Sequence, residues 1–140
     1  MPVDWNESSM GTGVKSLDVQ HKQLIHTLNM LVDKLRAGNE DEAVAPLLGS
    51  LEKYTADHFA HEEKCMEAYG CAAAARNKKE HAKFLSLLES LKQQYQETGP
   101  SRVLALEIEA KLLAWLVFHI KGTDRQLYGY ATAMGELDIK

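Results

Sequence analysis

Apolar side chains recur at steps of three and four residues along four segments of the chain. Such steps place residues on one face of a helix, so each segment is predicted to form an amphipathic helix. The four rows are Leu17, His21, Leu24, Leu28, Leu31 and Leu35; Val44, Leu48, Leu51, Thr55, His58, Glu62 and Cys65; Asn77, His81, Phe84, Leu88, Leu91 and Tyr95; and Ile108, Leu112, Trp115 and His119.

Glycine and proline mark the breaks between these segments, at residues 37–39, 69–71 and 98–100. Four helices joined by short connections are typical of an up-down-up-down bundle. The chain is therefore predicted to be an all-α four-helix bundle that forms a single domain over residues 1–140. Residues 1–16 are expected to form an N-terminal arm, and a last short helix is expected from about Asp124 to Met134.

Polar residues next to the rows indicate how the helices begin. Ser16 or Asp18 is expected to cap the first helix. Asn39 with Glu42 resembles a capping box for the second helix. Ser101 follows a Gly-Pro pair and is expected to cap the fourth helix.

The composition narrows the class of protein. Hydrophobic residues make up 45% and charged residues 26% of the 140 residues, and the net charge is −4. A mildly acidic chain without a basic patch argues against a nucleic-acid partner. The most apolar stretch, residues 112–120, is too short to span a membrane, and the N-terminus lacks a secretory signal. We expect a cytoplasmic monomer in which Cys65 lies in the core and Cys71 in a turn, both as free thiols.

Six polar residues interrupt the apolar rows near the ends of the helices. In an antiparallel bundle these four helix ends lie at the same end of the molecule, within roughly 10 Å of one level along the axis. A buried polar group is costly without a partner, so six of them on one seam require a shared one. The six residues are His21, His58, Glu62, Asn77, His81 and His119.

The residue types indicate a metal site. Imidazoles with carboxylates and no thiolate suit iron, manganese or zinc. Glu62 lies four residues after His58, on the same helix face, where its carboxylate can bridge two metals. Asp124 lies five residues after His119, which is off that face in a regular helix. If the helix ends near Gly122, Asp124 can fold back as a second bridge.

At these residues the sequence resembles the hemerythrin family, in particular its bacterial single-domain members. The resemblance covers nearly the whole chain, and the combined spacing is far more specific than any single motif. The matching stretches are residues 18–21, 58–63, 81–84 and 115–119, together with Trp5, Met66 and Asp124.

The resemblance implies two iron ions joined by an oxo or hydroxo group. By position, it implies that His21 and His58 bind the iron that keeps an open place. It implies that His81 and His119 bind the second iron and that Glu62 and Asp124 bridge both. Trp5, Leu24, Leu116 and Ile120 would line an apolar pocket where oxygen binds.

One ligand position departs from the family pattern. A third histidine of the second iron is expected four residues before His81, and this chain has Asn77 there. Three outcomes are open: Asn77 ligates through its amide oxygen, a water fills the place, or the second metal is weakly held or absent. Two nearby histidines, His26 and His61, are interpreted as surface or rim residues.

The leading hypothesis is a non-haem di-iron protein that binds molecular oxygen for carriage, storage or sensing. The alternative is a di-iron peroxidase or a protein that handles nitric oxide or iron, motivated by an exchangeable place beside Asn77. No nucleophile elbow, phosphate loop or nucleotide fingerprint is present in the sequence.

Overall fold

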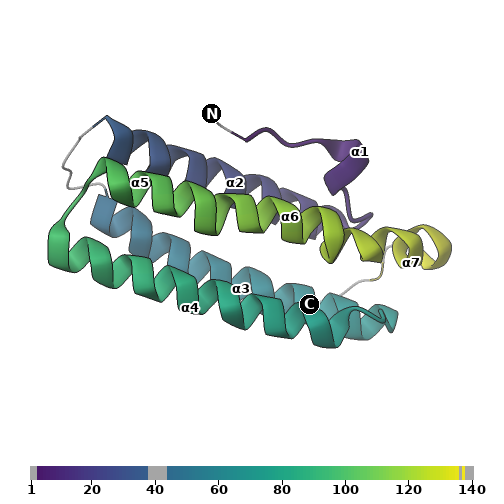
Figure 1. The fold of residues 1–140 in the computed structure, drawn as a ribbon. Coiled ribbons are helices and arrows are strands. Elements are labelled where there is room, and N and C mark those ends of the chain that lie inside the picture. Colours follow the sequence, from purple (N-terminus) through teal and green to yellow (C-terminus); the bar gives the residue numbers. More distant parts are fainter. Residues whose placement is uncertain (1–2, 38–43, 136, 138–140) are drawn as a thin grey trace.

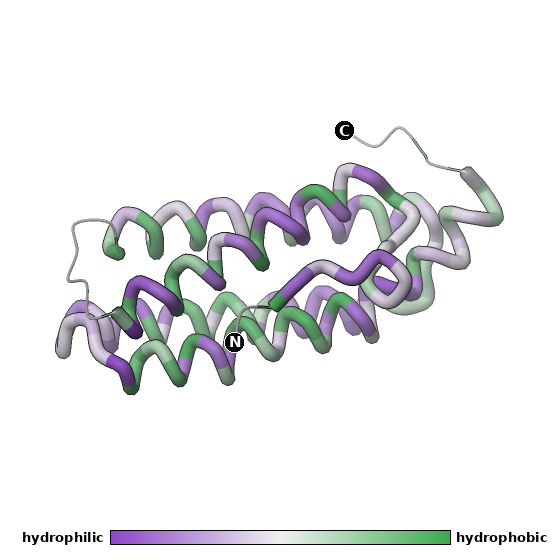
Figure 2. The backbone as a smooth tube through the Cα atoms, turned by 90° about the horizontal axis from the view of Figure 1, so that it is seen from above, coloured by the Kyte–Doolittle hydropathy of each residue, from purple (hydrophilic) through white to green (hydrophobic). Residues whose placement is uncertain are grey.

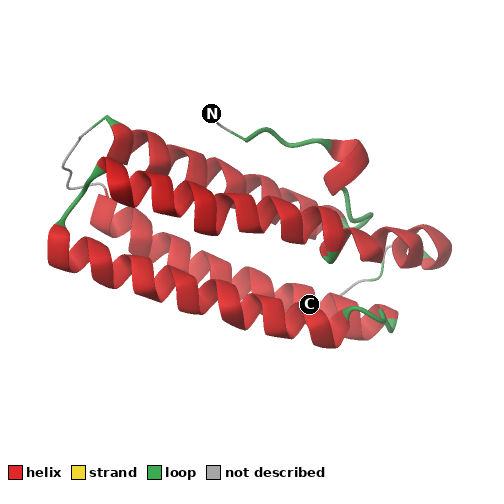
Figure 3. Cartoon of the chain, viewed as in Figure 1, coloured by secondary structure: helices red, strands yellow, loops and turns green. Residues whose placement is uncertain are grey.

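The computed structural model describes residues 3–37, 44–135 and 137, and it is a four-helix bundle (Figures 1 and 3). Three long helices are continuous, and the fourth consists of two α-helical parts joined by a π-helical turn. The elements are α1 (Glu7–Met10), α2 (Lys15–Arg36), α3 (Val44–Tyr69), α4 (Ala74–Thr98), α5 (Arg102–Ile108), η1 (Glu109–Leu113), α6 (Ala114–Gly122), η2 (Asp124–Gln126) and α7 (Leu127–Met134).

The predicted rows form the interior of the bundle. Every member of the first two rows is buried, and so are the members of the third row up to Leu91. Tyr95 and Trp115 lie at the edge of the core and are only partly buried. Figure 2 shows hydrophobic and hydrophilic positions alternating along the helices, as expected of amphipathic helices in a bundle.

The fourth helix is less regular than its row predicts. Between Glu109 and Leu113 it makes a π-helical turn, which takes more residues than an α-helical turn. Leu112 and Leu113 are therefore both buried, and Trp115 moves toward the edge of the core while Leu116 is buried. Trp115 still packs against the core, and its ring stacks on that of His119 with centroids 4.7 Å apart.

The helix ends confirm one predicted cap and correct another. Ser101 caps α5, accepting a hydrogen bond from the Leu104 backbone N–H at 3.0 Å. The prediction for Ser16 or Asp18 was wrong, because α2 begins after Val14 and has no side-chain cap. Asp18 instead accepts hydrogen bonds from the backbone N–H and hydroxyl of Thr12, which fixes the arm against α2. The predicted capping box at Asn39 and Glu42 lies outside the described residues.

The arm runs along the bundle and contains the short helix α1, which the sequence analysis did not predict (Figure 1). Two hydrogen bonds between Val3 and Asn29 attach its start to α2. Asn29 accepts from the Val3 backbone N–H at 3.0 Å and donates to the Val3 carbonyl at 2.8 Å. Trp5, two residues further along the chain, packs against the core. The arm is therefore a covering layer on α2 rather than a loose tail.

A second apolar cluster closes the bundle end where α7 lies. It joins the start of α2, the end of α3 and α7, and it contains both cysteines. Cys65 and Cys71 are buried free thiols, as predicted. None of the helices in the described part of the chain is both long enough and apolar enough to cross a membrane.

Candidate metal centre

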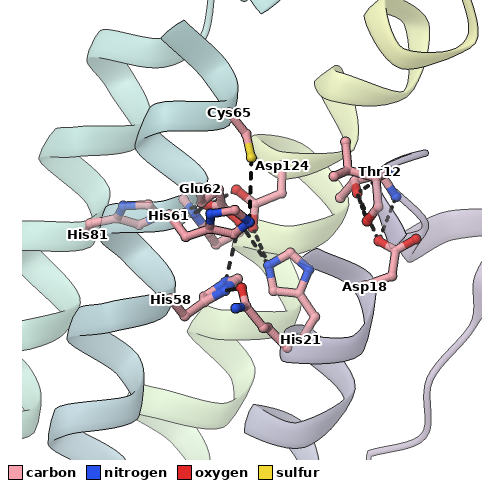
Figure 4. Close-up of polar contacts among 12 residues, drawn as sticks. Thr12, Asp18, His21, His58, His61, Glu62, Cys65, His81 and Asp124 are labelled. Atoms are coloured by element: carbon pink, nitrogen blue, oxygen red, sulfur yellow. Dashed lines mark hydrogen bonds and ion pairs between the residues drawn. The ribbon is translucent and has the colours of Figure 1, made fainter. Parts of the chain in front are cut away.

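The carboxylate of Glu62 is the meeting point of four histidines from four helices. Figure 4 shows three of them, His21, His58 and His81, around Glu62. Its Oε2 atom lies 2.9 Å from His21 Nε2 and 3.4 Å from His58 Nε2. Its Oε1 atom lies 2.8 Å from His81 Nε2 and 3.8 Å from His119 Nε2. All five side chains are buried. One carboxylate thus faces two histidines with each of its oxygens.

Asp124 reaches the same place from the end of the fourth helix. Helix α6 ends at Gly122, and the 3₁₀ turn η2 that begins at Asp124 returns this side chain toward the bundle axis. Its Oδ2 atom lies 3.2 Å from His21 Nε2, and its Oδ1 atom lies 3.0 Å from His119 Nε2. Asp124 therefore parallels Glu62, with one oxygen toward each histidine pair.

These side chains form two donor groups that could each hold a metal ion. In each group the potential ligand atoms all lie within 4.8 Å of one another. The first group consists of His21, His58 and Glu62, and the second group of Glu62, His81, His119 and Asp124. Because Glu62 belongs to both, the structure provides one compound site for two adjacent cations.

Unpaired atoms show that the donor set fits a cation. His58 Nε2, His119 Nε2 and both carboxylate oxygens of Asp124 are buried close to one another, but none of them makes a hydrogen bond of good geometry. Buried polar atoms without partners are rare in native proteins, since each is costly. A metal ion satisfies lone pairs of this kind directly, and nitrogen with oxygen donors suits iron. The residues present therefore fit the di-iron group that the sequence resemblance implies.

The electrostatics of two histidines are dominated by the carboxylates. Burial opposes the charge on His21, but bonding to Asp124 and Glu62 outweighs it and raises the His21 pKa to about 9. The same balance raises the pKa of His119 to about 10. In the metal-free chain these two imidazoles therefore hold protons at neutral pH, and a cation would displace them.

The remaining shifts follow from the same cluster. Burial alone would raise the Glu62 pKa, but the four histidines around it hold that pKa well below its usual range. Burial lowers the pKa of His58, assisted by the nearby charge of His21. His58 is thus a neutral imidazole, the form that binds metals, without any metal present.

Three more residues orient the histidines, and the sequence analysis missed them. In three of the four histidines the Nδ1 atom faces an oxygen on a neighbouring helix, which turns Nε2 toward the carboxylate centre. These pairs are His58 with Gln20 at 2.7 Å, His81 with Glu63 at 2.9 Å, and His119 with Glu80 at 2.9 Å.

A sequence signal for these residues did exist. Gln20, Glu63 and Glu80 each lie directly beside a donor residue in the chain, namely His21, Glu62 and His81. One residue along a helix turns the side chain by about 100°, toward the next helix of the bundle. Glu80 is partly buried at this position. Its carboxylate also accepts from Thr123 Oγ1.

Asn77 lies one helical turn before His81, on the same face of α4. Its side chain is fully buried, and neither amide atom has a hydrogen-bond partner. The other two histidines lie apart from the donor groups: His61 contacts Ser16 at 3.1 Å, and His26 is exposed on α2.

The four predicted pocket residues lie in the main core cluster or against it. Leu24, Leu116 and Ile120 are buried in the main core cluster, and Trp5 packs against that cluster. The Trp5 ring lies 6.4 Å from the His21 ring, centroid to centroid. The arm thus supplies an aromatic cover over one histidine of the site.

The fold and the paired donor groups define a four-helix metalloprotein with one site for two cations. Comparison with known proteins agrees. Residues 12–131 match the family described as Hemerythrin HHE cation binding domain. The chain is 30% identical to the bacteriohemerythrin of Pseudomonas paraeruginosa over 128 residues, which cover 91% of this chain and 79% of that protein.

Two further relatives support the same family. A bacteriohemerythrin of Methylococcus capsulatus is 33% identical over 127 residues, covering 91% of this chain and 94% of that protein. A crystal structure of wild-type hemerythrin superposes with a TM-score of 0.76 at 30% identity, covering 92% of this chain and 96% of that one. The chain belongs to the hemerythrin family. Proteins of this family bind oxygen at a non-haem di-iron centre.

Proposed function

We propose that this protein binds molecular oxygen reversibly at a di-iron centre, for carriage, storage or sensing. The observation that carries the proposal is the double contact of Glu62, whose two oxygens face two histidine pairs. Asp124 repeats this arrangement with one histidine of each pair. A single carboxylate in contact with four buried imidazoles has no other evident purpose in a soluble bundle.

The residue roles follow from the two donor groups. His21 and His58 would hold one iron, His81 and His119 would hold the other, and Glu62 and Asp124 would touch both. When bound, the two ions supply the electrons that make oxygen binding reversible.

The protein's own part is to keep the first group dry. Leu24, Leu116 and Ile120 are at most 1% exposed, and Trp5 covers His21 from the arm. An apolar surround excludes water and protons, and both would promote irreversible loss of the electrons from the site. These residues therefore favour release of oxygen unchanged over its reduction.

The proposed setting is a cytoplasmic monomer. The net charge is −4, and the outer face of α4 carries exposed Lys78 and Lys79. Lys78 already forms a 2.8 Å ion pair with Glu67 on α3, so its charge serves the chain itself. Size-exclusion chromatography with light scattering tests the monomeric state, and a dimer mass at micromolar concentration would contradict it.

The function is tested by loading the purified chain with ferrous iron without oxygen and then admitting oxygen. We expect two iron ions per chain and a new visible absorption band that disappears under argon and returns with oxygen. The iron-free protein is the blank. A band that decays within one cycle, with consumption of oxygen, would contradict reversible binding.

A further inference from the structure

Asn77 is the one residue of the α4 row whose buried polar atoms are left without partners. Its side chain is 0% exposed, yet both its Oδ1 and Nδ2 atoms lack hydrogen bonds. A buried amide can donate two hydrogen bonds and accept two. Leaving them unmade destabilises the fold, because each buried polar group has given up its hydrogen bonds to water. Some polar occupant beside Asn77 would remove this penalty.

The helix that carries Asn77 is fixed relative to the second group. One turn further along α4, His81 is within 2.9 Å of Glu62 and Glu63 through its two ring nitrogens. The His81 ring also stacks on Phe59, with centroids 3.8 Å apart and an interplanar angle of 4°. Asn77 therefore cannot approach the group by moving the helix without breaking these contacts.

The reach of the side chain decides what Asn77 can do. Its amide oxygen lies two bonds from Cβ, whereas the distal nitrogen of an imidazole lies three bonds away. An asparagine in this row thus stops short of where His81 and His119 place their Nε2 atoms. The gap favours a small molecule between the amide and the metal over direct ligation by the amide oxygen.

We propose that Asn77 holds an exchangeable small ligand, namely water, hydroxide or a small anion, on the second metal ion. The inference rests on the proposed function, since it needs an ion in the second group. A metal-bound water can donate to Asn77 Oδ1, and the Nδ2 amide can donate to a bound anion. Either occupant would pair one of the two orphaned amide atoms.

Azide is the probe, because it is a small anion that binds ferric iron and can accept a hydrogen bond. We compare the wild-type diferric protein with two variants. Asn77→His puts an imidazole at the position where the exchangeable ligand is proposed, and Asn77→Leu removes the amide. Leucine is close to asparagine in size but cannot form hydrogen bonds. Calorimetric titration gives azide equivalents per chain, and metal analysis gives iron content. The absorption intensity of the cobalt-loaded proteins reports coordination number independently of oxygen binding.

We expect the wild-type chain to bind one azide more per di-iron site than Asn77→His at equal metal content. Asn77→Leu should keep that additional azide with affinity reduced about tenfold or more, the effect of losing a hydrogen bond to a charged group. The cobalt spectrum should change on azide addition at the second ion in the wild type and not in Asn77→His.

Three results would overturn the inference. Equal azide uptake by the wild type and Asn77→His at full metal content would show that the second ion has no exchangeable ligand beside Asn77, while the proposed function stands. One metal per wild-type chain and two per Asn77→His chain would show that the place is a defect in metal binding. No metal in either protein would remove the proposed function itself.

Discussion

The first and second donor groups share Glu62 but are supported differently by the helices around them. In the first group His58 is oriented by the neutral amide of Gln20, and Nδ1 of His21 is buried without a partner. In the second group both histidines are oriented by carboxylates, His81 by Glu63 and His119 by Glu80. One half of the site is therefore backed by apolar or neutral groups and the other by negative charge.

A simple geometric rule produces this difference. Gln20 precedes a donor on α2, Glu63 follows one on α3, and Glu80 precedes one on α4. Neighbouring helices are antiparallel. A residue that precedes a donor on one helix and a residue that follows a donor on the next helix therefore point in the same direction around the bundle. Each helix in this way supplies the hydrogen-bond partner of a histidine on the next helix. On α6 the equivalent residue is Ile120, which follows His119, is fully buried and cannot hydrogen-bond.

In the first group, the lack of a hydrogen-bond partner for His21 Nδ1 and the apolar surroundings go together. By this rule the side chain at position 120 turns toward α2, where His21 Nδ1 is buried without a hydrogen-bond partner. Isoleucine leaves that nitrogen unpaired and keeps the surroundings apolar. In the second group the charge-assisted hydrogen bonds to Glu63 and Glu80 strengthen His81 and His119 as ligands.

The largest effect is expected from Glu62→Gln, because Glu62 joins the two groups. The neutral amide cannot balance two cations, and its nitrogen would face one pair of imidazoles. We expect the affinity for both ions to fall more than the roughly 100-fold seen for loss of outer-shell partners. Iron per chain after dialysis against a weak chelator measures it.

The matched control for Glu62→Gln is Glu67→Gln, the same substitution on the same helix at an exposed ion pair with Lys78. It should retain the wild-type iron content. If Glu62→Gln kept one ion with normal affinity, the two groups would be independent, and the description of one compound site would be wrong.

The sequence predicted the fold and the donor set because both depend on short periods within single helices. The steps from His58 to Glu62 and from Asn77 to His81 need only a regular helix. Asp124 was predicted only conditionally, because its position depends on where α6 ends, and Gly122 gave the signal for that. These residues lie close together at one end of the bundle.

What the sequence did not predict depends on rotation between helices. The support of His119 by Glu80 requires the relative orientation of two helices that are distant in the chain. The π-helical turn at Glu109–Leu113 has no signature in the row of apolar residues, and it moved Trp115 to the edge of the core. Both are tertiary outcomes, which local periodicity does not contain.

The next largest effect tests the difference in charge between the side chains that orient the histidines of the two groups. Glu80→Ala removes a carboxylate from His119 and should weaken the second ion about 100-fold. Gln20→Ala removes a neutral partner from His58 and should weaken the first ion only about tenfold, since hydrogen bonds to charged groups are roughly twice as strong. The time course of iron release to a chelator separates the two ions.

The same experiment has an internal reference. Glu67→Ala removes an exposed carboxylate that contacts none of the histidines and should release iron like the wild type. Equal weakening by Glu80→Ala and Gln20→Ala would show that charge on the orienting group is irrelevant and that only orientation matters.

A pH dependence follows from the raised pKa values of His21 and His119, about 9 and about 10. Relative to an unfolded histidine near 6.5, their protons stabilise the metal-free fold fully below about pH 6.5. That contribution is lost as pH rises through 9 to 10. A metal ion displaces these protons, so its affinity should rise up to about tenfold per pH unit for each proton released.

The gap in melting temperature between iron-loaded and iron-free protein should therefore widen from pH 6.5 to 8.5. Thermal unfolding at several pH values measures both curves. His26→Gln, which removes an exposed histidine on α2, should give the same curves as the wild type. A gap that stays constant across this range would mean that metal binding displaces no protons from His21 or His119.

The smallest effect is expected where the arm covers only the first group. Asn29→Ala removes the two hydrogen bonds that hold Val3 on α2, about 1 kcal/mol of net stability for each bond. Trp5, two residues on, would then leave His21 more often, and oxygen should dissociate a few-fold faster in stopped-flow measurements. The azide-binding position beside Asn77 lies in the second group and should keep its affinity.

Thr98→Ala, at the far end of α4, is the control for a small unrelated loss of stability. Faster azide exchange at both ions in Asn29→Ala would show that the arm covers the whole site, and the contrast between a covered first group and a separately accessible second group would not hold.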